Sequence, residues 1–418
     1  MSNDLMNLLV TDEVKTTLDW LDAQQVSMQE TVINWSHINS GSRNLDGLSA
    51  MEDEIVSAFR CLDTEIELIQ LEDTETVLDS GEVTQVANGR TIRIFKRPTA
   101  NRRVLMTGHY DTVFPKNSAF QKTHWLDENT LNGPGVADMK GGILVMLHAL
   151  QGFEKTAAAA NVGWEVLLSP DEETGSLASA PLLADRAQAA HIGMTYEPAL
   201  ADGTLAGERK GSGNYTVRVQ GKAAHAGREF FEGRNAVVLL AGIIGKLSAL
   251  TGGREGLTVN PAVITGGVAP NIVPDLAMCR FNVRLKAPED APWFEGEVQK
   301  IIDTANTEDG FTVELFGGIN RPPKALSDAN LKLMDLIGAC GKSLGLSIAY
   351  VPTGGCCEGN NLAAAGLPNV DTLGVRGGMI HSDEEFMIVE SLSERAKLSF
   401  LILTAFAHGA LDSVISAR

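Results

Sequence analysis

The stretch Val104-Leu105-Met106-Thr107-Gly108-His109-Tyr110-Asp111 decides the fold of this chain. Its apolar start, Val104–Met106, predicts a short buried strand that runs into Gly108. In an open parallel sheet, ligands bind beyond the carboxyl ends of the strands, which is where His109 and Asp111 would lie. Because turns also collect Gly, His and Asp without any function, the tetrapeptide by itself is a weak signal.

Strands and helices are expected to alternate on both sides of this stretch. Residues 10–75 have apolar and acidic positions at helical spacing and lead into a predicted strand near Glu65–Gln70. Met139–Phe153 predicts a buried helix, and Trp164–Leu168 and Ile192–Tyr196 predict further strands. This order predicts an α/β fold with a mostly parallel sheet and flanking helices.

The pattern changes near residue 207. Tyr215–Val219 and Cys279–Leu285 alternate apolar and polar residues with period two, which is typical of antiparallel strands with one exposed face. Asn235–Leu250 between them predicts a helix, so we expect a smaller inserted α+β domain. A chain of 418 residues is also too long for one ordinary core. The expected parts are 1–207 (catalytic domain, first part), 208–320 (insert) and 321–418 (catalytic domain, second part).

Composition limits the partners and the location. The formal net charge of −19 repels phosphate groups, so we expect neither nucleic acid nor an anionic membrane as a partner. The five cysteines are odd in number and scattered, which predicts no disulfide framework and favours reduced thiols in the cytoplasm. Met1–Trp20 lacks the basic start and apolar core of a signal peptide.

Other acidic and imidazole groups fall at the ends of other predicted elements. Asp138 lies between a glycine-rich loop and a helix, Asp171-Glu172-Glu173 follow one strand, and Glu197 follows another, while His381 lies in a late loop. Carboxylates packed together repel one another, so bound cations are the natural cause of such a cluster. Imidazole and carboxylate ligands without cysteine suit zinc in a hydrolytic site, and two histidines with three carboxylates suffice for a bridged pair of metals.

Six short motifs occur together in one order along the chain. They are Gly108–Val113, Asp138–Gly142, Asp171–Ser176, Glu197-Pro198, Ala224–Gly227 and His381-Ser382. Together they resemble the zinc exopeptidase family of bacterial glutamate carboxypeptidase, aminoacylase, acetylornithine deacetylase and succinyl-diaminopimelate desuccinylase. The resemblance covers nearly all the chain beyond the N-terminal helices. The pair Glu197-Pro198, with Glu rather than Asp, is most similar to the glutamate carboxypeptidase branch.

The resemblance implies a pair of zinc ions, or of other divalent metals such as cobalt or manganese. It implies that His109 and Glu197 bind one ion, that Glu173 and His381 bind the other, and that Asp138 bridges them. The catalytic domain would then be a di-zinc domain.

The resemblance also implies residues that act beside the metals. Asp111 would orient His109 through its other ring nitrogen. Glu172 would be the general base that takes a proton from the attacking water and delivers it to the leaving amine. His225 would reach from the insert into the site of a neighbouring subunit, so the insert would be both lid and dimerisation domain of a homodimer.

Three further residues match positions that hold substrate in the family: Asn271, Arg284 and Gly355. Arg284 is the better candidate for pairing with a substrate carboxylate because its guanidinium is a bidentate fork, although a cross-strand ion pair on an exposed sheet face is an equal alternative. The chain departs from the family pattern at Cys356-Cys357-Glu358, after the glycine loop. This departure leaves the identity of the substrate open.

The predicted function is hydrolysis of an amide bond next to an amino-acid carboxylate. The leading hypothesis is a glutamate-carboxypeptidase-like exopeptidase acting on small peptides, and the alternative is an N-acyl-amino-acid deacylase. A non-catalytic binding protein on the same fold is a third hypothesis. It is disfavoured because Glu172 and every expected metal ligand are present.

Overall fold

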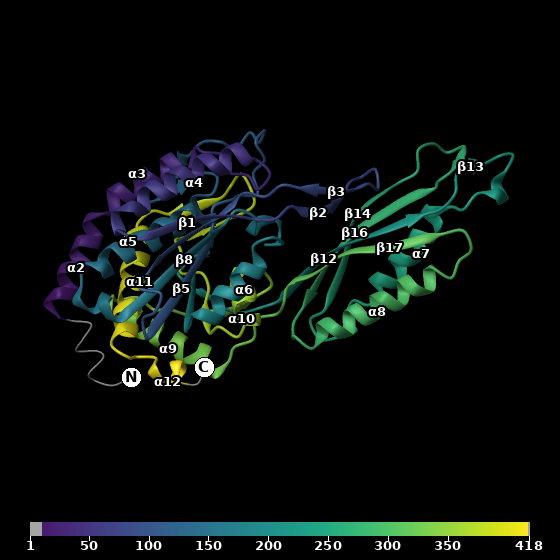
Figure 1. Ribbon diagram of the computed structural model, residues 1–418. Coiled ribbons are helices and arrows are strands. Elements are labelled where there is room, and N and C mark those ends of the chain that lie inside the picture. The colour runs from purple at the N-terminus through teal and green to yellow at the C-terminus, as the bar shows by residue number, and fades with distance from the viewer. Residues whose placement is uncertain (1–10, 417–418) are drawn as a thin grey trace.

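The computed structural model describes residues 11–416 of the chain. Half of the segment Met1–Trp20, which the sequence predicts not to be a signal peptide, lies outside the described residues. The described chain forms a large lobe and a smaller elongated lobe (Figure 1). Among the described residues, no helix combines the length and apolar character that crossing a bilayer requires.

The large lobe is built on a six-stranded sheet with the order β1-β4-β8-β5-β9-β19. Strand β5 pairs in parallel with β8 and β9, and β9 pairs in parallel with β19. Strands β1 and β4 are antiparallel, because they are joined by an extended hairpin rather than by a crossover helix. The sheet is therefore mixed, and β4 is the strand that runs against the other five. The bounds are β1 Glu65–Gln70, β4 Arg90–Lys96, β5 Arg102–His109, β8 Val162–Ser169, β9 Ile192–Thr195 and β19 Asn369–Val370.

Helices cover both faces of this sheet, which explains why Val104–Met106 of β5 are all apolar. Val104 and Met106 pack into the main core, whereas Leu105 packs into a second cluster on the opposite face. The main core is formed with α2 Asp12–Ala23, α3 Gln25–Ser36, α4 Leu45–Phe59, α5 Gly141–Glu154, α9 Asp328–Ser343, α11 Ser391–Ala407 and α12 Asp412–Ile415. The opposite face is covered by α6 Ala180–Ala189 and α10 Glu358–Ala364.

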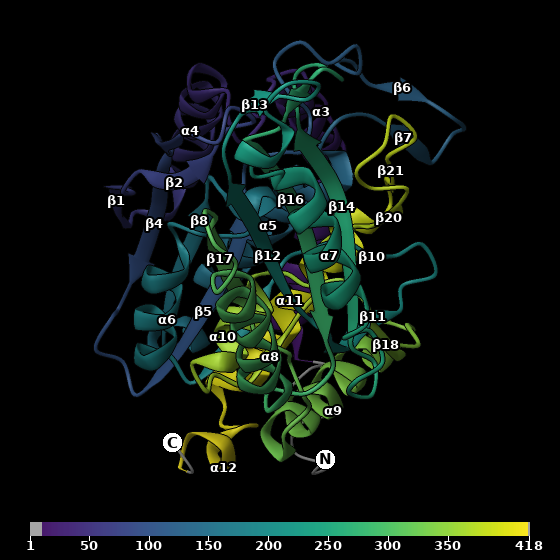
Figure 2. The same cartoon turned by 90° about the vertical axis from the view of Figure 1, so that its right-hand side faces the viewer.

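The smaller lobe is an antiparallel four-stranded sheet with two helices. The order is β14-β16-β12-β17, and Figure 2 shows α7 and α8 lying over one face of it. In β12, Tyr215, Val217 and Val219 are buried and alternate with more exposed residues, so one face packs on the helices. This lobe has its own core. The bounds are β12 Gly211–Gln220, β14 Thr258–Gly266, β16 Leu276–Leu285, β17 Thr312–Arg321, α7 Ala236–Ser248 and α8 Asp290–Ala305.

Short sheets complete the described fold. One has the order β10-β20-β21-β7-β6, and three are pairs: β11 with β18, β13 with β15, and β2 with β3. Their bounds are β2 Thr74–Val77, β3 Val83–Val86, β6 His124–Trp125, β7 Thr130–Asn132, β10 Ala199–Leu200, β11 Leu205–Arg209, β13 Ala224–His225, β15 Ile272–Val273, β18 Tyr350–Thr353, β20 Arg376–Gly378 and β21 Phe386–Ile388.

The connecting segments and a hairpin of the large lobe both make contacts between the lobes. The two connecting segments run side by side, since the backbones of Arg209 and Lys324 exchange hydrogen bonds of 3.0 and 2.9 Å. The β2–β3 hairpin also reaches from the large lobe to the small one (Figure 1). There, Asp79 forms an ion pair of 2.7 Å with Arg280, which also donates to the carbonyl of Val77 at 2.8 Å. The hairpin therefore adds a contact beyond the two covalent connections.

Candidate metal centre and active site

The candidate site lies at the carboxyl ends of β5, β8 and β9. His109 is the last residue of β5, and Glu197 follows β9. Glu172 and Glu173 lie in the 3₁₀ turn Glu172–Thr174 after β8, and Asp138 lies in the turn Val136–Lys140 before α5. Parallel strands place these loops at one edge of the sheet, so side chains far apart in sequence meet there.

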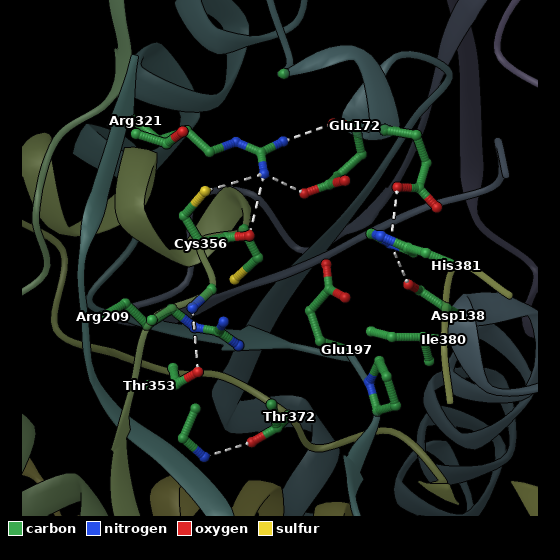
Figure 3. A pocket seen from close by; sticks show the side chains of 18 of the residues that line it. Asp138, Glu172, Glu197, Arg209, Arg321, Thr353, Cys356, Thr372, Ile380 and His381 are labelled. Carbon is green, nitrogen blue, oxygen red and sulfur yellow. Dashed lines mark hydrogen bonds and ion pairs between the residues drawn. The ribbon is translucent and has the colours of Figure 1, made fainter. Parts of the chain in front are cut away.

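Asp138 lies between the two histidines of the cluster, and Figure 3 shows its contact with His381. Its Oδ1 lies 3.1 Å from Nε2 of His109, and its Oδ2 lies 3.2 Å from Nε2 of His381. Glu197 Oε1 is 3.7 Å from the His109 nitrogen, and Glu173 Oε2 is 3.2 Å from the His381 nitrogen. The five side chains thus form two imidazole–carboxylate pairs, with the two oxygens of Asp138 between them.

The electrostatics of the cluster favour added positive charge. Burial raises the pKa of Glu173 to about 8 and that of Glu197 to about 7. Hydrogen bonds that His381 donates to the carboxylates of Asp138 and Glu173 raise the pKa of His381 to about 11. Burial thus disfavours the ionised forms of Glu173 and Glu197, whereas the neighbouring carboxylates favour the charged form of His381. Divalent cations offset both the burial cost and the repulsion among such carboxylates.

The donor set fits metal ions. Ligand atoms of His109, Asp138 and Glu173 lie within 4.8 Å of one another. Glu197 Oε1 is buried and has no hydrogen-bond partner in the described structure, so it is free to ligate. Nitrogen and carboxylate donors of this kind suit zinc and neighbouring divalent metals.

Asp111 supports both the histidine and the loop after β8. Nδ1 of His109 lies 3.0 Å from the Asp111 carbonyl oxygen and 3.4 Å from its carboxylate, so Nδ1 can donate while Nε2 faces the cluster. The Asp111 carboxylate accepts from Ser42 Oγ at 2.7 Å and from the backbone N–H groups of Glu172 and Glu173 at 3.2 and 3.1 Å. One residue therefore fixes His109 relative to Glu172 and Glu173.

Glu385 is a functional candidate that sequence reasoning missed. Its buried carboxylate accepts from the backbone N–H groups of Gly135, Ala137 and Asp138 at 3.0–3.1 Å. Burial raises the pKa of Glu385 to about 7. The carboxylate holds the loop that carries Asp138. Its position four residues after His381 was the only sequence signal, and Glu384 beside it looks the same in sequence but is exposed.

Arg321, the first residue after the expected insert, forms an ion pair with the candidate base Glu172. Its Nη1 forms an ion pair of 2.6 Å with Oε1 of Glu172, and its Nη2 donates to the Glu172 carbonyl at 2.7 Å. The guanidinium also donates to Ser176 Oγ at 3.0 Å. Arg321 ends β17 in the small lobe, so it ties the orientation of Glu172 to the position of that lobe.

A cavity of about 870 Å³ lies beside the cluster, and arginines line its far wall. Arg284 donates to Asn282 Oδ1 at 3.0 Å and to Cys356 Sγ at 3.3 Å. Among the described residues it has no acidic partner, so it does not make the cross-strand ion pair that was the alternative. Gly355 lines the same cavity, as expected.

The departure at Cys356-Cys357-Glu358 is accommodated by the structure. Cys357 Sγ accepts from the N–H of Gly359 at 3.3 Å, and its own N–H donates to Asn360 Oδ1 at 3.1 Å, so the thiol caps α10. Glu358 is buried, and burial raises its pKa well above the usual value. Cys356 and Cys357 both line the cavity, whereas Glu358 does not. The departure therefore changes two lining groups, not the helix that follows.

His225 and Asn271 lie away from the cluster of their own chain. His225 ends β13 at the far tip of the small lobe (Figure 1), is exposed, and accepts from Gly227 N–H at 3.1 Å. The carbonyl of Asn271 accepts from Ala226 N–H at 3.0 Å, which places Asn271 beside it. The structure brings these two residues together but not into the cavity.

Residues 105–405 match the model of peptidase family M20/M25/M40. The chain belongs to this family. The resemblance seen in the motifs is thereby confirmed, and this family member is a hydrolase of the metallopeptidase and amidohydrolase type.

Individual relatives of this M20 peptidase differ in their reactions. Carboxypeptidase G2 of Pseudomonas sp. (strain RS-16) is 26% identical over 313 residues, which cover 74% of this chain and 75% of the relative. Succinyl-diaminopimelate desuccinylase of Maricaulis maris (strain MCS10) is 29% identical over 227 residues, which cover 49% of this chain and 58% of the relative. Such identities do not decide between peptide and N-acyl substrates.

The fold is shared with solved structures of the family. The YXEP protein of Bacillus subtilis, described as a dinuclear metal-binding peptidase of family M20, superposes with a TM-score of 0.60. It is 14% identical, and the match covers 92% of this chain and 98% of the other.

The support of Asp138 by Glu385 gives a testable expectation. Glu385→Ala should weaken metal binding about 10- to 100-fold, because three backbone N–H groups behind Asp138 lose their acceptor. Titration of the metal-free protein with Zn²⁺ in a calorimeter measures the change. Glu384→Ala removes an exposed neighbouring carboxylate and should bind like the wild type. Equal affinities for the two variants would contradict the positioning role.

Proposed function

We propose that this chain is a two-zinc exopeptidase that removes a C-terminal amino acid, glutamate in the leading case, from a small peptide. One observation carries the proposal. Two imidazole–carboxylate pairs around Asp138 lie beside a cavity, and Arg284, which lines that cavity, has no acidic partner among the described residues. The cluster suits hydrolysis, and the unpaired guanidinium suits the carboxylate of the leaving amino acid.

The five ligands divide into two sites in this proposal. His109 and Glu197 would hold one ion, His381 and Glu173 would hold the other, and Asp138 would serve both. Their pairwise distances of 3.1–3.7 Å support this division. When bound, the metal pair supplies Lewis acidity, which lowers the pKa of water and polarises a carbonyl group.

Glu172 is the general base in this mechanism. It lies beside Glu173 but points to Arg321 rather than to an imidazole, so its carboxylate is free of the ligand set. It accepts the proton of the attacking water and later delivers it to the leaving amine. Arg321 orients the carboxylate, and Asp111 fixes the backbone that carries it.

Arg284 holds the substrate carboxylate in the cavity, with the Gly354-Gly355 loop approaching from the side. A guanidinium can bind a carboxylate through two parallel hydrogen bonds, which fixes the amide relative to the metals. An N-acyl-amino-acid deacylase would use the same anchor and differ only in what precedes the amide. The desuccinylase relative supports that alternative, and a substrate comparison separates the two.

The insert is assigned as lid and dimerisation domain, with boundaries at 208–320. Its separate core supports those limits. Strand β14 is an edge strand whose Val263 and Ile264 are 46% and 62% exposed, and Val238 on α7 is 67% exposed. An apolar edge strand beside an apolar helix face suits pairing with a second copy. In such a homodimer, His225 and Asn271 would serve the partner's site.

The remaining partner and location proposals follow from composition. The charge of −19 disfavours nucleic acid and anionic membranes, and five cysteines without a disulfide in the structure suit the cytoplasm.

The reaction is tested by a hydrolysis screen of the zinc-loaded protein. Dipeptides and N-acetyl amino acids that vary at the carboxyl-side residue should be cleaved, with dipeptides ending in glutamate the best. Glu172→Ala should keep two zinc ions per chain and lose at least about two orders of magnitude in kcat, because the proton acceptor is gone.

Glu54→Ala, an exposed change on α4, is the matched control and should keep full activity. Full activity of Glu172→Ala would overturn the mechanism. Preferential cleavage of N-acetyl amino acids would favour the deacylase, and no cleavage of any amide would overturn the function.

The action of His225 across a dimer is tested with mixed subunits. His225→Ala and Glu172→Ala are each expected to be inactive alone. Each mixed dimer contains one site with both residues intact and one site with neither, so a mixed dimer should have up to about half of the activity of a wild-type dimer. Confirmed mixed dimers that stay inactive would contradict action between subunits.

A further inference from the structure

A second cavity adjoins the metal centre on the side away from the arginine wall. Its volume is about 690 Å³, and it is lined by Gly41, Ser42, Arg43, Leu45, Val113 and Lys116 among others. Glu173 and Thr174 line both cavities. The two cavities therefore meet at the loop that carries the metal ligand Glu173.

The wall of this second cavity is fixed to the catalytic loops. Ser42 Oγ donates to the Asp111 carboxylate at 2.7 Å, and the Ser42 N–H donates to the carbonyl of Thr112 at 3.3 Å. The Thr112 N–H donates in turn to Ser40 at 3.0 Å. A side chain at Gly41 would meet the Phe114 carbonyl at 2.3 Å, so the two loops need this close approach. A group in this cavity would lie at a fixed place relative to the metals.

The cavity offers apolar side chains and one cationic side chain that has no acidic partner. Leu45 and Val113 are 43% and 36% exposed and offer apolar contact. Lys116 pairs with Asp46 at 3.0 Å, so their charges cancel. Arg43 donates only to the amide oxygen of Asn88, at 3.3 Å, and has no acidic partner among the described residues. The cavity therefore has one positive charge available to a ligand.

The direction in which the substrate would lie across the metal centre gives this cavity a role. If Arg284 anchors the carboxylate of the leaving amino acid in the main cavity, the acyl side of the amide must extend elsewhere from the metals. The second cavity is the other space that shares the ligand loop. We propose that it binds the acyl portion of the substrate and that Arg43 pairs with a carboxylate carried there. The inference rests on the proposed function and narrows its substrates to amides with an extended, acidic acyl group.

The test uses three amides that share glutamate as the leaving amino acid: benzoyl-, 4-carboxybenzoyl- and 4-(aminomethyl)benzoyl-glutamate. The wild-type enzyme should show a kcat/KM about fivefold higher for the carboxylate than for benzoyl, as expected for one solvent-accessible ion pair. In Arg43→Gln this ratio should fall to about one. In Arg43→Glu the preference should shift to the aminomethyl compound, whose charge is opposite.

Arg60→Gln, an exposed change outside both cavities, is the control and should keep the wild-type ratio. Because ratios between substrates are compared, a partial loss of folded enzyme does not affect the result. Cleavage of all three amides at ratios that Arg43 does not alter would overturn this inference and leave the proposed function intact. If the enzyme cleaves neither these three amides nor any substrate of the screen, the proposed function is wrong, and the inference that rests on it is wrong as well.

Discussion

The burial of Asp138 between two imidazole–carboxylate pairs is the constraint on which the rest of the site depends. Three carboxylates so close together are costly in a protein interior unless positive charge offsets them. Much of the surrounding structure holds them in place. Glu385 fixes the backbone of Asp138, and Asp111 fixes His109 together with the loop of Glu172 and Glu173. These two supports lie far apart in the sequence, so the complete fold is needed to form the cluster.

The same constraint couples the two lobes. Arg321 belongs to the last strand of the small lobe but forms an ion pair with Glu172 of the large lobe. Arg284, also from the small lobe, supplies the free guanidinium of the cavity wall. In the proposed mechanism, the large lobe would hold the metals, whereas the orientation of Glu172 and the binding of the substrate would depend on the position of the small lobe. The contact between the β2–β3 hairpin and Arg280 restricts that position.

Much of the fold could be predicted from local pattern. The apolar run before His109, the helix after Asp138 and the period-two strands of the insert all appear in the structure near the expected residues. The reversed direction of β4 could not be predicted, because β4 follows the β2–β3 hairpin and pairs with β8, which is distant in sequence. The roles of Glu385 and Arg321 were also invisible, since burial and long-range contacts distinguish Glu385 from Glu384. Cys357 departs from the family pattern, but its thiol caps α10 in the way that a hydroxyl group would.

The central claim is that Asp138 bridges two cations. The most direct test is anomalous diffraction at the zinc edge from crystals of the zinc-loaded protein. Two peaks are expected, one near His109 and Glu197 and the other near His381 and Glu173, separated by roughly 3.5–4 Å across the Asp138 carboxylate. A single peak in this cluster, or peaks only at Cys356 and Cys357, would contradict the account.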